Sequence, residues 1–206
     1  MNSLTQPEAR PQTTYYTLAE SPLGSLLFMS DGVSLTGLHF AGHDHAPRIG
    51  DGWIEDRRPL APAVRQLAEY FAGQRSSFDL RLGLRGTSFQ LLVWEALLRI
   101  PRGETRSYRD VAQELGRPGA YRAVGAAVGS NPVSIVVPCH RVIGAGGQLV
   151  GYGWGLDRKR WLLAHEGVPS HSSRTPPSEM ARETRTVSPP ELTDRRGTAG
   201  GASGLP

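Results

Sequence analysis

The chain has 206 residues and a mass of 22.3 kDa, which suits one ordinary domain or two small ones. It is 38% hydrophobic with a mean hydropathy of −0.33, and no apolar run approaches the roughly 18 residues of a membrane span, so a transmembrane protein is excluded. The net charge is +4, and the single cysteine, Cys139, excludes an internal disulfide framework and a cysteine-rich zinc site.

Both ends of the chain have the composition of disordered segments. In residues 169–206, 21 of the 38 residues are Pro, Ser, Thr or Gly. The segment therefore has too few large apolar side chains to offset the conformational entropy lost when a chain becomes ordered. Residues 1–12 are polar and contain Pro7 and Pro11, without the apolar core of a secretory signal. We therefore expect two disordered ends, a cytoplasmic location and a folded body over residues 13–168.

The first part of that body, residues 13–84, is predicted to be a small α+β domain. Strands are expected over 15–20, 25–30 and 33–40, and the Asp31-Gly32 step between apolar runs predicts a hairpin. Apolar residues at helical spacing predict a helix over 62–72, followed by a strand over 78–82. We find no chemistry in this part, because His39, His43 and His45 lack the cysteine or carboxylate partners of a metal site.

The second part, residues 85–168, changes to helices and carries the positive charge. It holds 11 basic and 6 acidic residues, against 7 and 9 in residues 1–84, as expected for a surface that contacts phosphates. Ser88 is predicted to cap a helix over 88–100, in which one apolar stripe is formed by Phe89, Leu92, Val93, Ala96, Leu97 and Ile100. Ser107 is predicted to cap a second helix over 107–115, with Asp110 completing a capping box, and a short third helix is expected over 120–129. Two helices joined by a tight Gly-containing turn indicate a helix-turn-helix.

Cys139 follows an apolar segment, 131–137, that is predicted to be extended. An unpaired cysteine is more often an inert core residue than a nucleophile. Here adjacent His140 and Arg141 favour the thiolate, since nearby positive charge and a basic partner lower the pKa of a thiol. A carboxylate would orient the histidine, and Glu166 is one of six candidates in this part of the chain.

The stretch 87–167 resembles the O6-alkylguanine-DNA alkyltransferases, which repair DNA by taking an alkyl group onto a cysteine. The resemblance rests on ordered blocks, of which the most specific is Pro138-Cys139-His140-Arg141-Val142-Ile143-Gly144. The others include Ile100-Pro101-Arg102-Gly103-Glu104-Thr105, Ser107-Tyr108, Arg122-Ala123-Val124-Gly125, Asn131-Pro132, Gly151-Tyr152 and the block from Lys159 through Trp161-Leu162-Leu163 to Glu166-Gly167. The resemblance implies a ribonuclease-H-like first domain and a mainly helical second domain that binds DNA.

The resemblance also implies roles for individual residues. Cys139 is the alkyl acceptor, activated by His140 through a water molecule and by Glu166 behind it, in a single-turnover displacement without a cofactor or metal. Tyr108 supports the guanine leaving group, and Asn131 links the helix-turn-helix to the segment that carries the cysteine. The guanine pocket is implied to be lined by Val142, Tyr152 and Gly153.

For DNA, the resemblance implies that a helix-turn-helix lies in the minor groove of duplex alkylated DNA. Arg122 is the side chain that takes the place of the extruded nucleotide. The small residues Ala123, Ala126 and Ala127 suit a close approach. The other DNA contacts implied are Ser107, Arg109, Ala120 and Tyr121, and the protein is expected to act as a monomer.

Two alternatives stay open on the residues alone. A DNA-binding regulator would use the helix-turn-helix without chemistry, and a cysteine hydrolase built on Cys139 and His140 would turn over an acyl or peptide substrate without binding DNA. Substrate preference between O6-alkylguanine and O4-alkylthymine is not encoded in a visible motif. Trp154, at the expected edge of the pocket, and Tyr121, beside Arg122, leave the range of alkyl groups and the strength of DNA binding undetermined.

Overall fold

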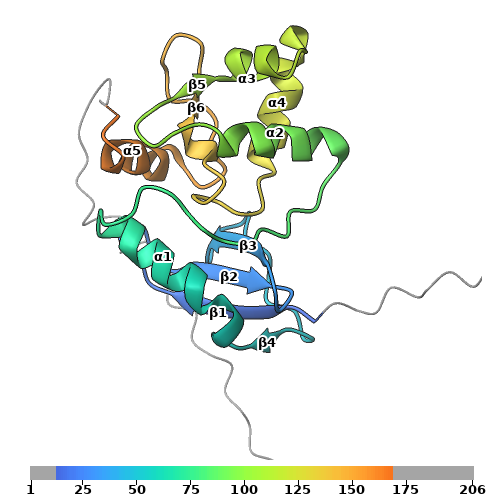
Figure 1. Ribbon diagram of the computed structural model, residues 1–206, viewed down its shortest axis with the longest axis vertical. Helices are drawn as coiled ribbons and strands as arrows, with labels where there is room; N and C mark the ends of the chain where they lie inside the picture. Colours follow the sequence, from blue (N-terminus) through green and yellow to red (C-terminus); the bar gives the residue numbers. More distant parts are fainter. Residues whose placement is uncertain (1–12, 169–206) are drawn as a thin grey trace, which may run out of the picture.

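The computed structural model describes residues 13–168, so the two ends predicted to be disordered, 1–12 and 169–206, lie outside the described residues. A small sheet with one helix forms the first half, and a cluster of helices forms the second (Figure 1). The predicted α+β class is confirmed. Within residues 13–168, no helix is both long and apolar enough to cross a membrane.

The sheet of the first half has four strands in the order β3-β2-β1-β4, with β1, β2 and β3 antiparallel and β4 parallel to β1. The predicted Asp31-Gly32 hairpin is confirmed. Gly32 takes a φ of 96°, a left-handed conformation that suits glycine, and the Asp31 carboxylate accepts hydrogen bonds from the N–H groups of Val33 and Ser34. The strands span Tyr15–Ala19 (β1), Leu26–Ser30 (β2), Leu35–Phe40 (β3) and Ile54–Glu55 (β4).

One helix, α1 (Ala61–Phe71), follows a single 3-10 turn, η1 (Arg58–Leu60), and lies across the sheet (Figure 1). Its bounds agree with the predicted helix to within a residue at each end. The predicted strand over 78–82 is wrong, because only Leu82 forms a bridge, to Leu35 of β3, and the rest of the segment has no strand partner. An alternating pattern is therefore not enough to make a strand when only the end of the segment pairs with the edge strand β3.

Three helices of the second half pack on one another, and the chain then returns through short elements to a last helix. The predicted helices over 88–100, 107–115 and 120–129 are confirmed with slightly shorter bounds. The elements are α2 (Ser88–Leu98), β5 (Arg106–Ser107), α3 (Tyr108–Glu114), η2 (Pro118–Ala120), α4 (Tyr121–Gly129), η3 (Cys139–Arg141), β6 (Val142–Ile143) and α5 (Leu156–His165).

The helix starts follow from short polar motifs. Ser107 and Asp110 form the predicted capping box of α3: the Asp110 N–H donates to Ser107 Oγ at 3.1 Å, and the Ser107 N–H donates to the Asp110 carboxylate at 2.8 Å. For α2 the predicted cap is wrong by one residue, since Thr87 is the N-cap and pairs with Gln90, while Ser88 is already helical. Two neighbouring hydroxyls leave that choice open in the sequence.

Two expectations about helix faces also change. Leu92, predicted to lie in the apolar stripe of α2, is 44% exposed, while Val93 and Leu97 are fully buried. In α4, Ala127 belongs to the core at 3% exposure, and its carbonyl accepts from the Trp94 indole, so only Ala123 and Ala126 of the predicted small face are exposed. The close-approach surface of α4 is therefore narrower than predicted.

The segment before Cys139 is not extended as predicted. Val136 and Val137 are turned back by a tight fold in which Ile135 has a φ of 71°, in the left-handed region that β-branched residues rarely adopt. The start of the segment pairs with the sheet of the first half, because Leu38 donates to the Pro132 carbonyl at 2.9 Å and accepts from the Ser134 N–H at 3.0 Å. This joint fixes the cysteine relative to both halves.

Candidate active site

A cavity of about 330 Å³ opens beside the thiol of Cys139 and lies between the two halves of the molecule. Cys139 is only 4% exposed and begins the short helix η3. The residues that line the cavity are His45, Tyr108, Gly125, Val128, Gly129, Asn131, Cys139, Gly151, Tyr152, Gly153 and Trp154. The structure therefore brings together at one cavity the thiol and four other predicted site residues from the second half: Tyr108, Asn131, Tyr152 and Gly153.

Burial raises the pKa of the Cys139 thiol above its ordinary value, although a hydrogen bond with Asn131 and the positive charge of Lys159 act in the opposite direction. The sequence expectation that Arg141 favours the thiolate is wrong, because its guanidinium faces Glu166 instead. The Arg141 fork donates twice to the Glu166 carboxylate, each time at 2.8 Å. The resting thiol therefore stays protonated and needs a base before it reacts.

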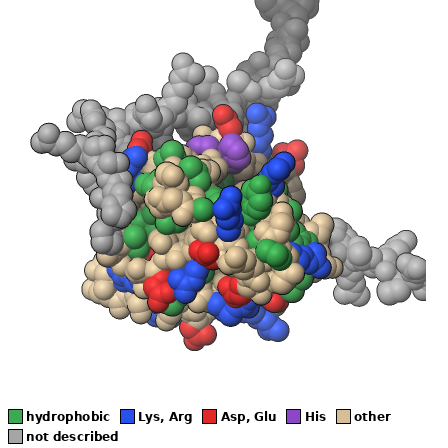
Figure 2. Space-filling view, turned by 90° about the horizontal axis from the view of Figure 1, so that it is seen from above, with side chains coloured by type: hydrophobic (Ala, Val, Ile, Leu, Met, Phe, Trp, Pro, Cys, Tyr) green, Lys and Arg blue, Asp and Glu red, His purple; other side chains and the backbone are tan. Residues whose placement is uncertain are grey.

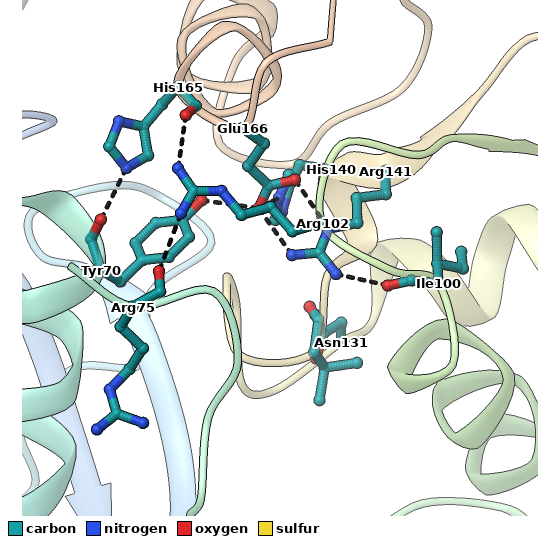
Figure 3. A network of polar contacts seen from close by, with 10 residues as sticks. Tyr70, Arg75, Ile100, Arg102, Asn131, His140, Arg141, His165 and Glu166 are labelled. Atoms are coloured by element: carbon teal, nitrogen blue, oxygen red, sulfur yellow. Dashed lines mark hydrogen bonds and ion pairs between the residues drawn. The ribbon is translucent and has the colours of Figure 1, made fainter. Parts of the chain in front are cut away.

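Behind the thiol, the Glu166 carboxylate is the centre of a buried network drawn in Figure 3. Its Oε1 atom lies 2.9 Å from His140 Nε2 and also accepts from Arg141 and Tyr70, each at 2.8 Å. Burial alone would raise the pKa of Glu166, but the hydrogen bonds from His140 and Arg141 hold it well below its usual range. Glu166 is therefore ionised throughout the physiological pH range.

An ionised Glu166 determines which nitrogen of His140 carries the proton. Nε2 faces the carboxylate and must donate, which leaves Nδ1 with a lone pair, and Nδ1 has no hydrogen-bond partner in the protein. Burial lowers the pKa of His140, so the ring is neutral near pH 7. A neutral, fully buried imidazole with an open Nδ1 is a base placed one residue from the thiol.

Asn131 and Tyr108 connect this site to the helices. The Asn131 amide donates to the Val137 carbonyl at 2.8 Å and accepts from the Val133 N–H at 3.0 Å, so it holds the turn that precedes Cys139. Tyr108, at the start of α3, directs its hydroxyl toward the carbonyls of Val150 and Gly151 at 3.2 and 3.3 Å. Each residue thus ties the predicted helix-turn-helix to a wall of the cavity.

Lys159 is a buried charge that the sequence matched to the family but to which it assigned no role. It is fully buried on α5 and donates to the carbonyls of Val142, Val150 and Gly151, the last two at 2.8 and 3.4 Å. Burial lowers its pKa to about 8. Lys159 therefore holds the 150–151 wall of the cavity and places a positive charge near the thiol.

The first half, in which the sequence showed no chemistry, supplies two residues to the site. Tyr70 of α1 is fully buried and donates to Glu166, and the Arg102 guanidinium lies over its ring at 5.7 Å (Figure 3). His45 lines the cavity and lies beside Trp154, with ring centroids 6.2 Å apart. Neither residue belongs to a local motif, so only the tertiary structure reveals them.

Trp154 is a wall of the cavity rather than a residue at its edge. It is 6% exposed, and its indole N–H donates to Ser134 Oγ at 2.7 Å. Gly153 also lines the cavity, whereas Val142 is fully buried, is absent from the lining, and contributes its carbonyl to Lys159. Of the three residues predicted to form the guanine pocket, two therefore face the cavity and Val142 lies behind it.

The predicted DNA-contact residues lie on the outside of α3 and α4. Arg109 and Arg122 both lie over the ring of Tyr121, at 5.6 and 5.8 Å from its centroid, and all three side chains are exposed. Ala123 is exposed too, Ala120 is half-buried, and Ser107 is occupied as a cap. Figure 2 shows the face above the helices, on which Lys and Arg side chains are spread among apolar and acidic ones.

The histidines of the first half do not form a metal site. His43 and His45 lie 5.3 Å apart, ring to ring, and pack near Trp154, but residues 13–168 contain no group of three His, Cys, Asp or Glu side chains arranged to hold a metal ion. Burial lowers the pKa of His39 to about 4. These rings therefore serve as aromatic packing around Trp154.

Two family models match the chain. The DNA-binding domain of 6-O-methylguanine DNA methyltransferase matches residues 88–168, and the ribonuclease-like domain of 6-O-methylguanine DNA methyltransferase matches residues 14–84. Together they cover most of the chain and nearly all of the described residues. The ranges fall on either side of the connection between the sheet half and the helical half.

Individual relatives agree with these models. The methylated-DNA–protein-cysteine methyltransferase of Mycolicibacterium paratuberculosis is 52% identical over 160 residues, covering 78% of this chain and 96% of the relative. The one from Methanosarcina acetivorans is 48% identical over 153 residues, 74% of this chain and 98% of the relative.

Solved structures extend the likeness to the fold. Mycobacterium tuberculosis O6-methylguanine methyltransferase matches with a TM-score of 0.71 and 48% identity over 78% of this chain and 97% of that one. The complex of M. tuberculosis OGT with DNA matches with a TM-score of 0.69 and 50% identity over 74% and 92% of the two chains. The similarity therefore covers both halves and the joint between them.

Proposed function

Because the chain belongs to the 6-O-methylguanine DNA methyltransferase family, we propose that it repairs DNA by moving an alkyl group from guanine O6 to its own Cys139. The observation that carries this proposal is a buried thiol in the wall of a cavity, followed directly in the chain by a neutral histidine whose Nδ1 has no hydrogen-bond partner in the protein. The relatives named for this activity and the DNA complex of one of them support it.

The transfer follows from the residues around the cavity. His140 Nδ1 takes the thiol proton through a bridging water molecule, and the thiolate attacks the alkyl carbon, so that an S–C bond forms while the C–O6 bond breaks. The released electron pair passes into the guanine, which Tyr108 stabilises through its hydroxyl. The thiol proton ends on the guanine, so that the products are an alkylated Cys139 and an ordinary guanine.

The thiol can contact the alkylated nucleobase only if that nucleobase leaves the DNA duplex. A nucleobase atom inside a duplex is not accessible to a thiol that is 4% exposed, so the nucleotide is extruded into the cavity. We assign Arg122, on the exposed face of α4, to the gap left in the base stack, with Tyr121 and Arg109 beside it. The exposed Ala123 and Ala126 allow α4 to enter the minor groove.

Each molecule acts once, because none of the side chains that line the cavity offers the chemistry to cleave a thioether. The reaction needs no metal or organic cofactor, since the leaving group is stabilised by hydrogen bonds and the nucleophile by a base. A monomer in the cytoplasm remains our prediction for the state and location of the protein. The domain bounds 13–84 and 85–168 likewise remain proposals.

Intact-mass measurement tests the proposal directly. The full chain is incubated with a duplex oligonucleotide that contains one O6-methylguanine, and we expect a single methyl group on Cys139 in one-to-one stoichiometry. Cys139→Ser is the control and should bind the duplex without gaining mass. Repeated turnover, or an unmodified Cys139 after the lesion has disappeared, would contradict the mechanism.

The same experiment separates the two alternatives. A regulator without chemistry binds the duplex but leaves the protein mass unchanged. A cysteine hydrolase turns over an activated acyl ester and does not bind the duplex.

A further inference from the structure

We propose that Tyr70, a residue of the ribonuclease-like half, is a positioning residue for the transfer reaction. The inference rests on the proposed function and deepens it, because Tyr70 acts through Glu166 on His140, the catalytic base, without touching the substrate. Tyr70 does not line the cavity, and its hydroxyl lies behind the His140 ring, on the carboxylate.

The hydroxyl of Tyr70 completes a shared hydrogen-bond acceptor. Glu166 Oε1 accepts hydrogen bonds from Tyr70 Oη and from Arg141 Nη2, each at 2.8 Å, and it lies 2.9 Å from His140 Nε2. Among the contacts of this cluster, Oε2 accepts a hydrogen bond from Arg141 Nε. Figure 3 shows Tyr70 entering this cluster from the side of α1, opposite Arg141. Tyr70 therefore competes with His140 for the same oxygen.

Packing accounts for the ring of Tyr70 but not for its hydroxyl. The ring lies 5.3, 5.5 and 5.1 Å from those of Phe71, Phe78 and His165, and a phenylalanine would make the same contacts. The hydroxyl is fully buried, and its partner is the carboxylate that orients the base. Burial and the nearby Glu166 raise the pKa of Tyr70, so the hydroxyl remains a donor at every working pH.

The consequence concerns the basicity of Glu166 toward His140. With the Tyr70 bond present, part of the charge on Oε1 is satisfied from the first half of the chain, and the carboxylate stabilises the imidazolium less. Without it, the His140–Glu166 pair is stronger, His140 holds a proton to higher pH, and Nδ1 is no longer a free base. The charged and titratable groups around this pair are Tyr70, Arg102, Cys139, Arg141, Tyr152, Lys159 and His165.

Tyr70→Phe in the full chain tests the inference. We expect the first-order rate of methyl transfer at saturating protein to fall about tenfold near neutral pH, the effect of losing one hydrogen bond to a charged group. The acid limb of the pH–rate profile should move to higher pH, and the affinity for the methylated duplex should not change. A purely structural role would not move the pH profile.

Tyr16→Phe is the matched control, because it removes a tyrosine hydroxyl from the same half that lies 3.5 Å from the exposed Glu55. It should transfer methyl groups at the wild-type rate. Denaturant unfolding of both variants at the assay temperature establishes that they are folded.

Three results would overturn the inference: a Tyr70→Phe protein with the wild-type rate and pH profile, a loss confined to DNA affinity, or a loss explained by unfolding. If the unaltered protein fails to transfer the methyl group, the proposed function is wrong, so the two failures are distinguishable.

Discussion

The helical half carries the thiol, the histidine, the carboxylate and the exposed arginines, whereas the sheet half carries no reactive motif and yet contacts the site at two points. Tyr70 reaches Glu166 from behind the thiol, and His45 lines the cavity in front of it. The chemistry is therefore concentrated in one half, and the other half shapes and orients it. Substitutions in the helical half should cause the largest losses in the free energy of unfolding, and substitutions in the sheet half should alter the transfer rate and the selectivity between alkyl groups.

The largest effect is expected for Glu166→Gln. The neutral amide leaves the buried Arg141 guanidinium without its ion-pair partner, and breaking such a pair costs about 3–5 kcal/mol of the free energy of unfolding. Urea denaturation measures the loss. Glu114→Gln is the control, since its pair with Arg99 is more than 40% exposed on both sides and should contribute under about 1 kcal/mol. Equal losses in the two variants would contradict the assigned network.

Lys159→Met is expected to rank second. Three backbone carbonyls lose their buried donor, which costs about 1–3 kcal/mol of the free energy of unfolding, and the thiol loses a nearby positive charge, so its pKa rises further. Unfolding curves and the rate at which iodoacetamide labels Cys139 at pH 8 check both expectations. Arg160→Met changes the next residue, whose ion pair with Asp157 is exposed, and should label at the wild-type rate.

Acidification provides the next test. The folded-state pKa values of His140 and Glu166 both lie below their ordinary values, so the unfolded chain binds more protons as the pH falls. The stabilisation is fully present above about pH 6.5, the ordinary value for histidine, and is lost as the pH falls toward the two folded values. Urea midpoints between pH 8 and pH 4 should decrease, and Glu166→Gln should decrease less on the acid side. A flat profile would contradict the assigned protonation states.

The smallest effect is expected for His45→Ala. Removing this exposed ring widens the cavity without opening the core, so the free energy of unfolding should change by under about 0.5 kcal/mol. The ratio of benzyl to methyl transfer should rise several-fold, because the cavity wall beside Gly153 recedes. Asp44→Ala, a neighbour outside the lining, should keep the original ratio. An unchanged ratio in His45→Ala would show that the sheet half does not set the alkyl range.

The difference between the halves also explains what the sequence could predict. The caps of α3, the Asp31-Gly32 hairpin and the helices depend on residues within a few positions of one another, and their signals are local. Thr87 was missed only because Ser88 offers the same hydroxyl one residue later.

The site was predictable only where a motif carried it. Cys139 and His140 are adjacent, and the resemblance supplied Glu166, Tyr108 and Asn131. Tyr70 lies 96 residues from the carboxylate it contacts, and no periodicity or spacing marks such a pair. The strand predicted over 78–82 failed for the related reason that its partner edge is set by tertiary structure.

The contacts on both sides of Cys139 hold the thiol at a fixed distance from α3 and α4. Parallel pairing of Arg106 with Val142 and of Ser107 with Ile143 binds the start of α3 to the chain just after the thiol, and Asn131 binds the end of α4 to the chain just before it. We therefore expect a fixed distance between the proposed DNA-contact helices and Cys139, so that the duplex bends or widens to fit. Because that deformation costs more for stiff base steps than for flexible ones, the same lesion should be repaired at different rates in different flanking sequences.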